Sequence, residues 1–146
     1  MKTAIIYSSK HYFNTKKLVD AIAAVDTVTL IDANVVEKME LSSFDRIGFA
    51  SGIYFLKYHK TIRKFAKRNL PKEKDVFFLH TAGKPQEKQV KAIKKITDAK
   101  KCRCLGIYSC KGSELYGPFR FLERILKTHP NKEEQAQAVA FYQSLS

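Results

Sequence analysis

Short apolar runs that alternate with amphipathic stretches constrain the fold of this chain more than any other feature of its sequence. The runs have the length of strands and are largely apolar, as is typical of parallel strands buried on both faces. A helix-like spacing of apolar residues follows most of them, so the pattern predicts right-handed βαβ units. The predicted strands are residues 2–8, 27–33, 46–51, 75–83 and 101–110. The predicted helices are residues 14–25, 58–70, 86–99 and 131–145.

The length of 146 residues suits a single domain, residues 1–146, with one hydrophobic core. The segment 34–45 between the second and third strands is short, which predicts a turn or an abbreviated helix there. Five parallel strands in a chain of this length favour the strand order 2-1-3-4-5 in an α/β sandwich. Such a sheet binds its ligand beyond the carboxyl ends of the strands, at the switch point between the first and third strands.

The loop between the first strand and the first helix, YSSKHYFNTKKL, is rich in neutral hydrogen-bonding side chains. Ser8, Ser9 and Thr15 carry hydroxyls, and Asn14 is a plausible N-cap of the helix. A helix N-terminus offers unpaired N–H groups and a partial positive charge, which suits a phosphate. A plain polar loop with an asparagine cap explains this stretch equally well. It contains neither the Walker motif nor the dinucleotide glycine motif.

Two further loops should meet this one at the same edge of the sheet. The stretch SGIYFLKYHK begins with small residues and continues with aromatic ones, which could stack on a flat ring or simply cover the sheet end. The stretch HTAGKP has small residues that let the backbone approach a ligand edge. The three loops together fit a flat nucleotide with a terminal phosphate. The first loop suits the phosphate, the second has aromatic side chains, and the third has an accessible backbone. FMN is the natural candidate in this fold.

Three stretches of the chain resemble the flavodoxin family. IIYSSKHYFNTKKLVDAI resembles its phosphate loop, and FDRIGFASGIYFLKYHKTIRKF resembles its third strand and flavin-stacking loop. CKGSELYGPF and HPNKEEQAQAVAFYQSL resemble the tail of a bacterial branch of short flavodoxin-like proteins. The resemblance covers essentially the whole chain. It implies a flavodoxin-like three-layer sandwich with a five-stranded parallel sheet in the order 2-1-3-4-5.

The same resemblance implies an FMN site. It implies that the phosphate is held by Ser9, Lys10, His11, Asn14 and Thr15, in a loop that also contains Tyr12 and Phe13. It implies that the isoalloxazine is lined by Ser51, Gly52, Ile53 and Tyr54, with Tyr54 stacked on the ring and Phe55 next to it. It implies that Thr81, Ala82 and Gly83 lie along the pyrimidine edge.

Two features depart from the family pattern. Phe13 stands where the family usually has glycine, and it could either force the loop open or fold back as a lid. The stretch RFLERILKT replaces the glycines that usually precede H-P-N.

The net charge of +13 is the opposite of that of most flavodoxins, which are acidic. A carrier of this charge would dock on a redox partner protein with an acidic surface, or react with a small anionic electron acceptor. The lysines cluster in residues 60–75 and 84–101, where solvated helix faces are a better interpretation than a polyanion site. Specific nucleic-acid binding is not expected, because no aromatic platform flanks these runs.

The rest of the composition indicates the expected compartment and the roles of the cysteines and histidines. No apolar run is long enough to span a membrane or to form a signal-peptide core, so a cytoplasmic protein is expected. Three cysteines argue against a disulfide framework, and Cys102 and Cys104 should share one strand face as structural thiols. His11, His59, His80 and His129 are interpreted as structural or surface residues.

Three functions remain open from the sequence. The leading hypothesis is an FMN-binding redox protein that transfers electrons through the flavin. The second is an FMN-dependent oxidoreductase of the quinone or porphyrinogen type. The third is a flavodoxin-like module that has lost FMN and serves as a binding domain, which Phe13 would favour.

Overall fold

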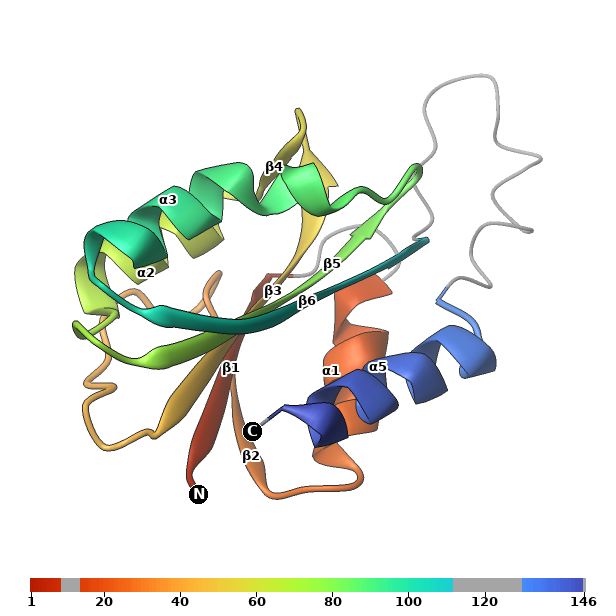
Figure 1. Ribbon diagram of the computed structural model, residues 1–146, viewed down its shortest axis with the longest axis horizontal. Helices are drawn as coiled ribbons and strands as arrows, with labels where there is room; N and C mark the ends of the chain where they lie inside the picture. The colour runs from red at the N-terminus through yellow and green to blue at the C-terminus, as the bar shows by residue number, and fades with distance from the viewer. Residues whose placement is uncertain (9–13, 112–129, 146) are drawn as a thin grey trace.

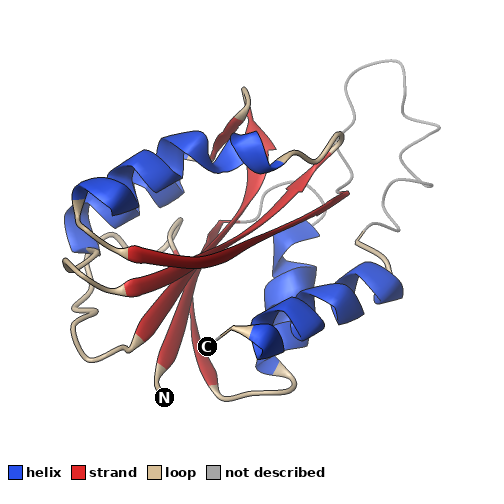
Figure 2. Ribbon diagram, viewed as in Figure 1, coloured by secondary structure: helices blue, strands red, loops and turns tan. Residues whose placement is uncertain are grey.

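A computed structural model of the protein describes residues 1–8, 14–111 and 130–145. A twisted sheet forms the middle of three layers, and helices of the described residues cover both of its faces (Figures 1 and 2). The parallel strands are β1 (Thr3–Ser8), β2 (Val28–Asp32), β3 (Arg46–Tyr54), β5 (Asp75–Ala82) and β6 (Arg103–Lys111). They lie in the order β2-β1-β3-β5-β6. The predicted α/β sandwich and its order 2-1-3-4-5 for the parallel strands are therefore confirmed.

The helices separate into two layers. Helices α1 (Asn14–Ala23) and α5 (Lys132–Ser144) cover one face, and α2 (Lys60–Asn69) and α3 (Lys91–Ala99) cover the other (Figure 1). A short 3-10 helix, η1 (Glu87–Val90), precedes α3, so the predicted helix 86–99 begins with a tighter turn.

The start and end of the first helix differ from the prediction. Asn14 is the first helical residue and not the N-cap, and the preceding position lies outside the described residues. Leu18 and Ile22 are fully buried, but Val25 is 52% exposed. The helix ends at Ala23, so Val25 no longer follows the helical period that would have placed it on the buried face.

The stretch after the third predicted strand is a β-hairpin and not a loop. Strand β3 continues to Tyr54, and β4 (Lys57–Tyr58) pairs with it antiparallel, Ile53 opposite Tyr58. The two residues between them, Phe55 and Leu56, have φ of 51° and 66°. Positive φ at both central residues is the pattern of tight hairpins, which usually use Asn or Gly there. The sequence lacks that signal, and the hairpin was missed for this reason.

The connection from β2 to β3 contains no helix. Residues 33–45 form turns, in agreement with the prediction of a turn or an abbreviated helix. Every other connection between successive parallel strands contains a helix: α1, α2, or η1 with α3.

Apolar side chains form a separate cluster on each face of the sheet. Phe49, Phe78 and Ile62 lie in the cluster beneath α2 and α3, and Phe77 and Leu79 lie in the cluster beneath α1 and α5. The alternation along β5 divides its side chains between the two clusters. Cys102 and Cys104 both pack against the cluster beneath α2 and α3, as the C-x-C spacing predicts.

Candidate functional site

The carboxyl ends of the central strands bring the predicted loops together. The register places Ser8 of β1 beside Ser51 of β3, and Gly52 of β3 beside Thr81 of β5. The start of α1, the β3–β4 hairpin and the turn after β5 therefore meet at one edge of the sheet. This is the switch point at which open parallel sheets bind ligands.

The first turn of α1 lies at this edge and has no acidic residue. Asn14 and Thr15 are 6% and 1% exposed, and Lys16 and Lys17 follow them. Lysine in a first turn opposes the helix dipole, whereas an anion bound there would complement it. Helix α5 shows the ordinary arrangement, with Glu133 and Glu134 in its first turn. The other predicted phosphate ligands, Ser9, Lys10 and His11, lie outside the described residues, as do Tyr12 and Phe13.

Tyr54 is the last residue of β3 and is half-buried. Its ring meets the ring of His59 edge-on, with the centroids 4.9 Å apart. A Cβ built on Gly52 would lie 3.4 Å from this ring, so Tyr54 folds back over the small residue. His59 is fixed in turn, because its Nδ1 accepts a hydrogen bond at 3.1 Å from the backbone N–H of Thr61 and caps α2. Tyr54 is therefore held at the edge of the sheet.

The hairpin tip exposes apolar surface. Phe55 is 98% exposed and Leu56 is 72% exposed. Tyr54 and Phe55 line a hollow of about 420 Å³, together with the basic side chains Lys57, Lys60 and Arg63. An aromatic wall beside cations suits a flat anionic ligand.

Two of the predicted ring-lining residues have side chains that serve the fold. The Ser51 hydroxyl accepts a hydrogen bond at 3.0 Å from the backbone N–H of His59 and donates one to the carbonyl of Gly52. Ile53 is 5% exposed and belongs to the cluster beneath α2 and α3. A ligand at this edge would therefore meet Ser51 and Ile53 through the backbone.

The end of β5 supplies small residues. Thr81 and Ala82 are each 2% exposed and stay within the strand, paired with Cys110 and Lys111 of β6. Gly83 is exposed and begins the following turn. The predicted third loop therefore begins at Gly83.

A buried polar pair beside this edge was not predicted. The Tyr58 hydroxyl lies 3.1 Å from Nδ1 of His80, and Nε2 of His80 lies 3.0 Å from the carbonyl of Gln86. Because a carbonyl only accepts, Nε2 carries the proton and the Tyr58 hydroxyl donates to Nδ1. Burial lowers the pKa of His80 to about 4. His80 is therefore a neutral structural residue, in keeping with the sequence interpretation.

Thiol chemistry at this edge is disfavoured. Burial, followed by the Glu134 charge, raises the pKa of Cys110 to about 12, so the thiol stays protonated at neutral pH.

Within the described ranges, no three His, Cys, Asp or Glu side chains gather in a way that could hold a metal ion. In the same part of the chain, every helix is too short or too polar to cross a membrane.

One contact joins the end of β1 to the loop after β2. The Asn34 side-chain amide donates a hydrogen bond to the Ser8 hydroxyl at 3.0 Å. Asn34 was not among the predicted site residues. It lies 26 residues from Ser8 in the sequence and follows the second strand, whose loop was not expected to reach the site.

Comparison with known proteins agrees with the fold. The chain matches the flavodoxin domain family over residues 4–138. It therefore belongs to the flavodoxin family. It is also 35% identical to an uncharacterized protein of Methanocaldococcus jannaschii, over 99% of this chain and 98% of the relative.

Solved structures share the fold at low sequence identity. The two-electron reduced flavodoxin of Megasphaera elsdenii has a TM-score of 0.67 at 16% identity, over 97% of this chain and 99% of that one. A flavoprotein in complex with FMN from Lactobacillus acidophilus has a TM-score of 0.58 at 12% identity, over 74% of this chain and 92% of that one. These similarities support the three-layer architecture.

Proposed function

We propose that the protein binds FMN at the carboxyl edge of its sheet and transfers electrons through the bound flavin. The observation that carries the proposal is a juxtaposition at the switch point. The acid-free first turn of α1 lies at the same edge as the aromatic residues Tyr54 and Phe55. The first suits a phosphate and the second suits a flat ring, and FMN combines both.

The residues present fit such a cofactor. The N–H groups of the α1 first turn, near Asn14 and Thr15, would hold the phosphate. Tyr54 would pack on the isoalloxazine from a position fixed by His59. Gly83, which follows the paired residues Thr81 and Ala82 at the end of β5, would present backbone groups to the pyrimidine edge. The flavin, when bound, supplies the one- or two-electron chemistry, and the protein contributes binding, orientation and local polarity.

The role of Tyr54 gives a direct test of the site. Tyr54→Ala should weaken FMN binding by about 1–3 kcal/mol, the usual cost of losing a base–aromatic stack. Tyr54→Phe keeps the ring and should bind FMN like the wild type. Affinities from fluorescence titration of all three proteins would decide this. Equal affinity of the alanine variant and the wild type would exclude stacking by Tyr54.

The basic surface sets an expectation for electron acceptors. The FMN-loaded, reduced protein should be reoxidised faster by ferricyanide as ionic strength falls, because the acceptor is anionic. Hexaamminecobalt(III), a cationic acceptor, should show the opposite salt dependence. Stopped-flow absorbance at several salt concentrations measures both rates. Salt dependences of the same sign for the two acceptors would contradict electrostatic steering.

The same basic surface favours a second candidate, an FMN-dependent oxidoreductase with an anionic substrate of the quinone or porphyrinogen type. Turnover would separate it from a carrier. An oxidoreductase should consume such a substrate catalytically with a defined KM, whereas a carrier should exchange electrons with it without saturation.

A further inference from the structure

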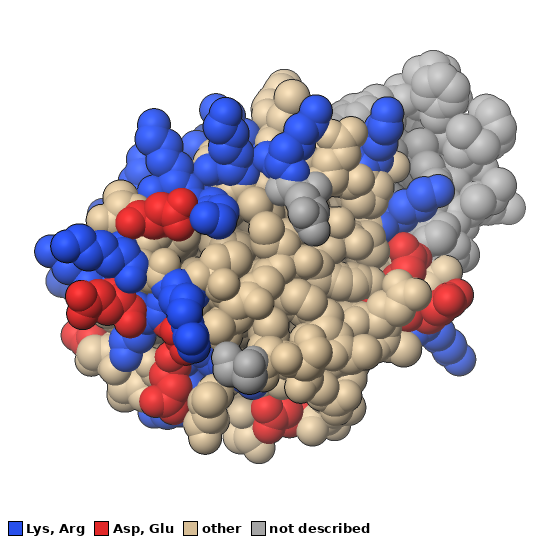
Figure 3. Space-filling model, viewed as in Figure 1, with Lys and Arg blue, Asp and Glu red and all other residues tan. Residues whose placement is uncertain are grey.

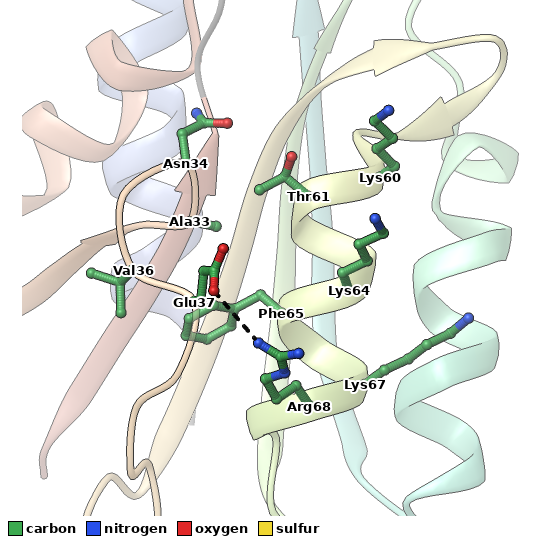
Figure 4. A pocket seen from close by; sticks show the side chains of 10 residues that line it. All are labelled: Ala33, Asn34, Val36, Glu37, Lys60, Thr61, Lys64, Phe65, Lys67 and Arg68. Carbon is green, nitrogen blue, oxygen red and sulfur yellow. Dashed lines mark ion pairs between the residues drawn. The ribbon is translucent and has the colours of Figure 1, made fainter.

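A groove runs along α2 on the basic face of the molecule. It lies between residues 33–37 and the helix, and it has a volume of about 750 Å³ (Figure 4). Thr61, Phe65 and Arg68 point from α2 toward the opposite segment, and Lys60 and Lys64 stand along the rim (Figure 4).

The groove exists because one crossover lacks a helix. The chain from β2 to β3 passes on the α2 side of the sheet as turns, so no helix lies beside α2 where a crossover helix normally would. Asn69 closes one end of the space. Its side-chain amide donates to the carbonyl of Glu37 and its oxygen accepts from the N–H of Met39, both at 3.0 Å.

The lining is amphipathic. Phe65 and Ala33 are 3% and 5% exposed and contribute the apolar floor with the partly buried Val36. The Lys60 and Lys64 side chains are exposed, and none of the ion pairs among the described residues engages either of them. Arg68 meets the one carboxylate of the lining, Glu37, at 3.9 Å, and both side chains are largely exposed. The groove therefore combines an apolar floor with uncompensated positive charge.

We propose that this groove binds an acidic amphipathic helix of a partner protein, in the place of the missing crossover helix. Its apolar side would lie on Phe65, Ala33 and Val36, and its carboxylates would face Lys60 and Lys64. A single-stranded nucleic acid would need several aromatic rings on which successive bases stack, and the groove lining offers one, Phe65. A flat membrane surface cannot enter a groove. Binding here needs no flavin, so the proposal is independent of FMN binding.

The test uses a designed peptide and the whole protein. The probe is an acetylated, amidated helix of roughly 14 residues, about four turns, with Leu and Ala on one side and Glu on the other. A matched peptide has Gln in place of each Glu. Titration of the isotope-labelled protein, followed by backbone amide shifts with and without FMN, gives both the site and the affinity.

Two charge-reversal variants make the test specific. K60E/K64E alters the groove rim, and K91E/K95E makes the same change at the same spacing at the start of α3. We expect shifts in residues 33–37 and 60–68, and roughly tenfold weaker binding for K60E/K64E than for K91E/K95E. Val36→Ser should also weaken binding, whereas Val35→Ser should not, because Val35 is outside the groove lining.

Several results would overturn the proposal. Equal weakening by the two double variants would mean general attraction to a basic protein. Shifts centred on α3, equal affinity for the Gln peptide, or no saturable binding of the Glu peptide would each exclude the groove as its site.

Discussion

The two helix layers of this sandwich differ sharply in charge. Helices α2, η1 and α3 contain nine Lys and Arg against two Asp and Glu, a formal charge of +7. Helices α1 and α5 contain three of each, a formal charge of zero. Lys and Arg side chains accordingly crowd over the margin formed by α2 and α3 (Figure 3). The two basic stretches of the sequence, which looked like separate solvated faces, lie side by side and form one surface.

The layers also differ in how they close on the sheet. Beneath α1 and α5, Gly48 and Gly106 leave room for the rings of Phe77 and Phe141. Arg46 is 8% exposed there, donates to the Thr3 hydroxyl at 2.9 Å and lies 4.6 Å from the centre of the Tyr142 ring. Beneath α2 and α3 the buried polar pair is neutral, and a groove remains open. The sheet is therefore closed by dense packing beneath α1 and α5, whereas the layer of α2 and α3 leaves an open, positively charged groove.

The largest expected effect tests the packing of the neutral layer. Gly48→Ala should lower the free energy of unfolding by about 3 kcal/mol, because its Cβ would clash with the buried Phe77 ring. Gly52→Ala is the control, since its Cβ would make an ordinary contact at 3.4 Å with Tyr54. Urea unfolding of both variants measures the difference. Similar midpoints for the two would contradict the close packing at Gly48.

The pH dependence of stability tests His80, the buried histidine beneath α2 and α3, and should be of similar size. The pKa of His80 is about 4 in the folded protein, against about 6.5 unfolded, so the unfolded chain binds more protons between these values. The contribution of His80 to the free energy of unfolding is fully present above pH ~6.5 and should fall by about 3 kcal/mol as the pH drops to ~4. His80→Gln should lack this component in urea unfolding across that range. Parallel pH profiles for the variant and the wild type would refute a neutral buried His80.

A smaller effect tests Arg46, the buried cation beneath α1 and α5. Arg46→Met should cost about 2 kcal/mol, because it removes the bond to Thr3 and the cation–π contact with Tyr142. Arg103→Met removes a salt bridge to Asp75 at 2.8 Å, but its side chain is 68% exposed. That control should change stability by less than ~1 kcal/mol. Equal losses in thermal unfolding would show that burial does not distinguish the two arginines.

The smallest effect concerns the end of α2. The Lys100 ammonium donates to the carbonyls of Ala66, Lys67 and Leu70 at 2.9, 2.8 and 2.7 Å. Lys100→Met should therefore cost about 1 kcal/mol, as expected for a cation at a helix C-terminus. The exposed neighbour Lys101 offers the control Lys101→Met. Hydrogen exchange in the last turn of α2 should rise in the first variant only; unchanged exchange would exclude this capping role.

The sequence predicted the parallel strands well because their apolar runs, such as VFFL at 76–79, are unbroken. It missed the β3–β4 hairpin because Phe55 and Leu56 occupy positive-φ positions without the usual Asn or Gly. The burial of His80 follows from alternation with Phe78, but its partner Tyr58 lies 22 residues away and no local pattern reveals such a contact. The groove could not be predicted, because the sequence does not show that α2 and the segment 33–37 are neighbours in space.

Binding of FMN at the carboxyl edge of the sheet is tested by titrating the purified protein with FMN. The visible spectrum of the protein as purified is recorded first, and flavin fluorescence is then followed during the titration. The prediction is a bound yellow chromophore, or quenching that saturates at one FMN per chain. A colourless protein that leaves FMN fluorescence unchanged would contradict it, and would mean that this flavodoxin fold serves as a binding module without its flavin.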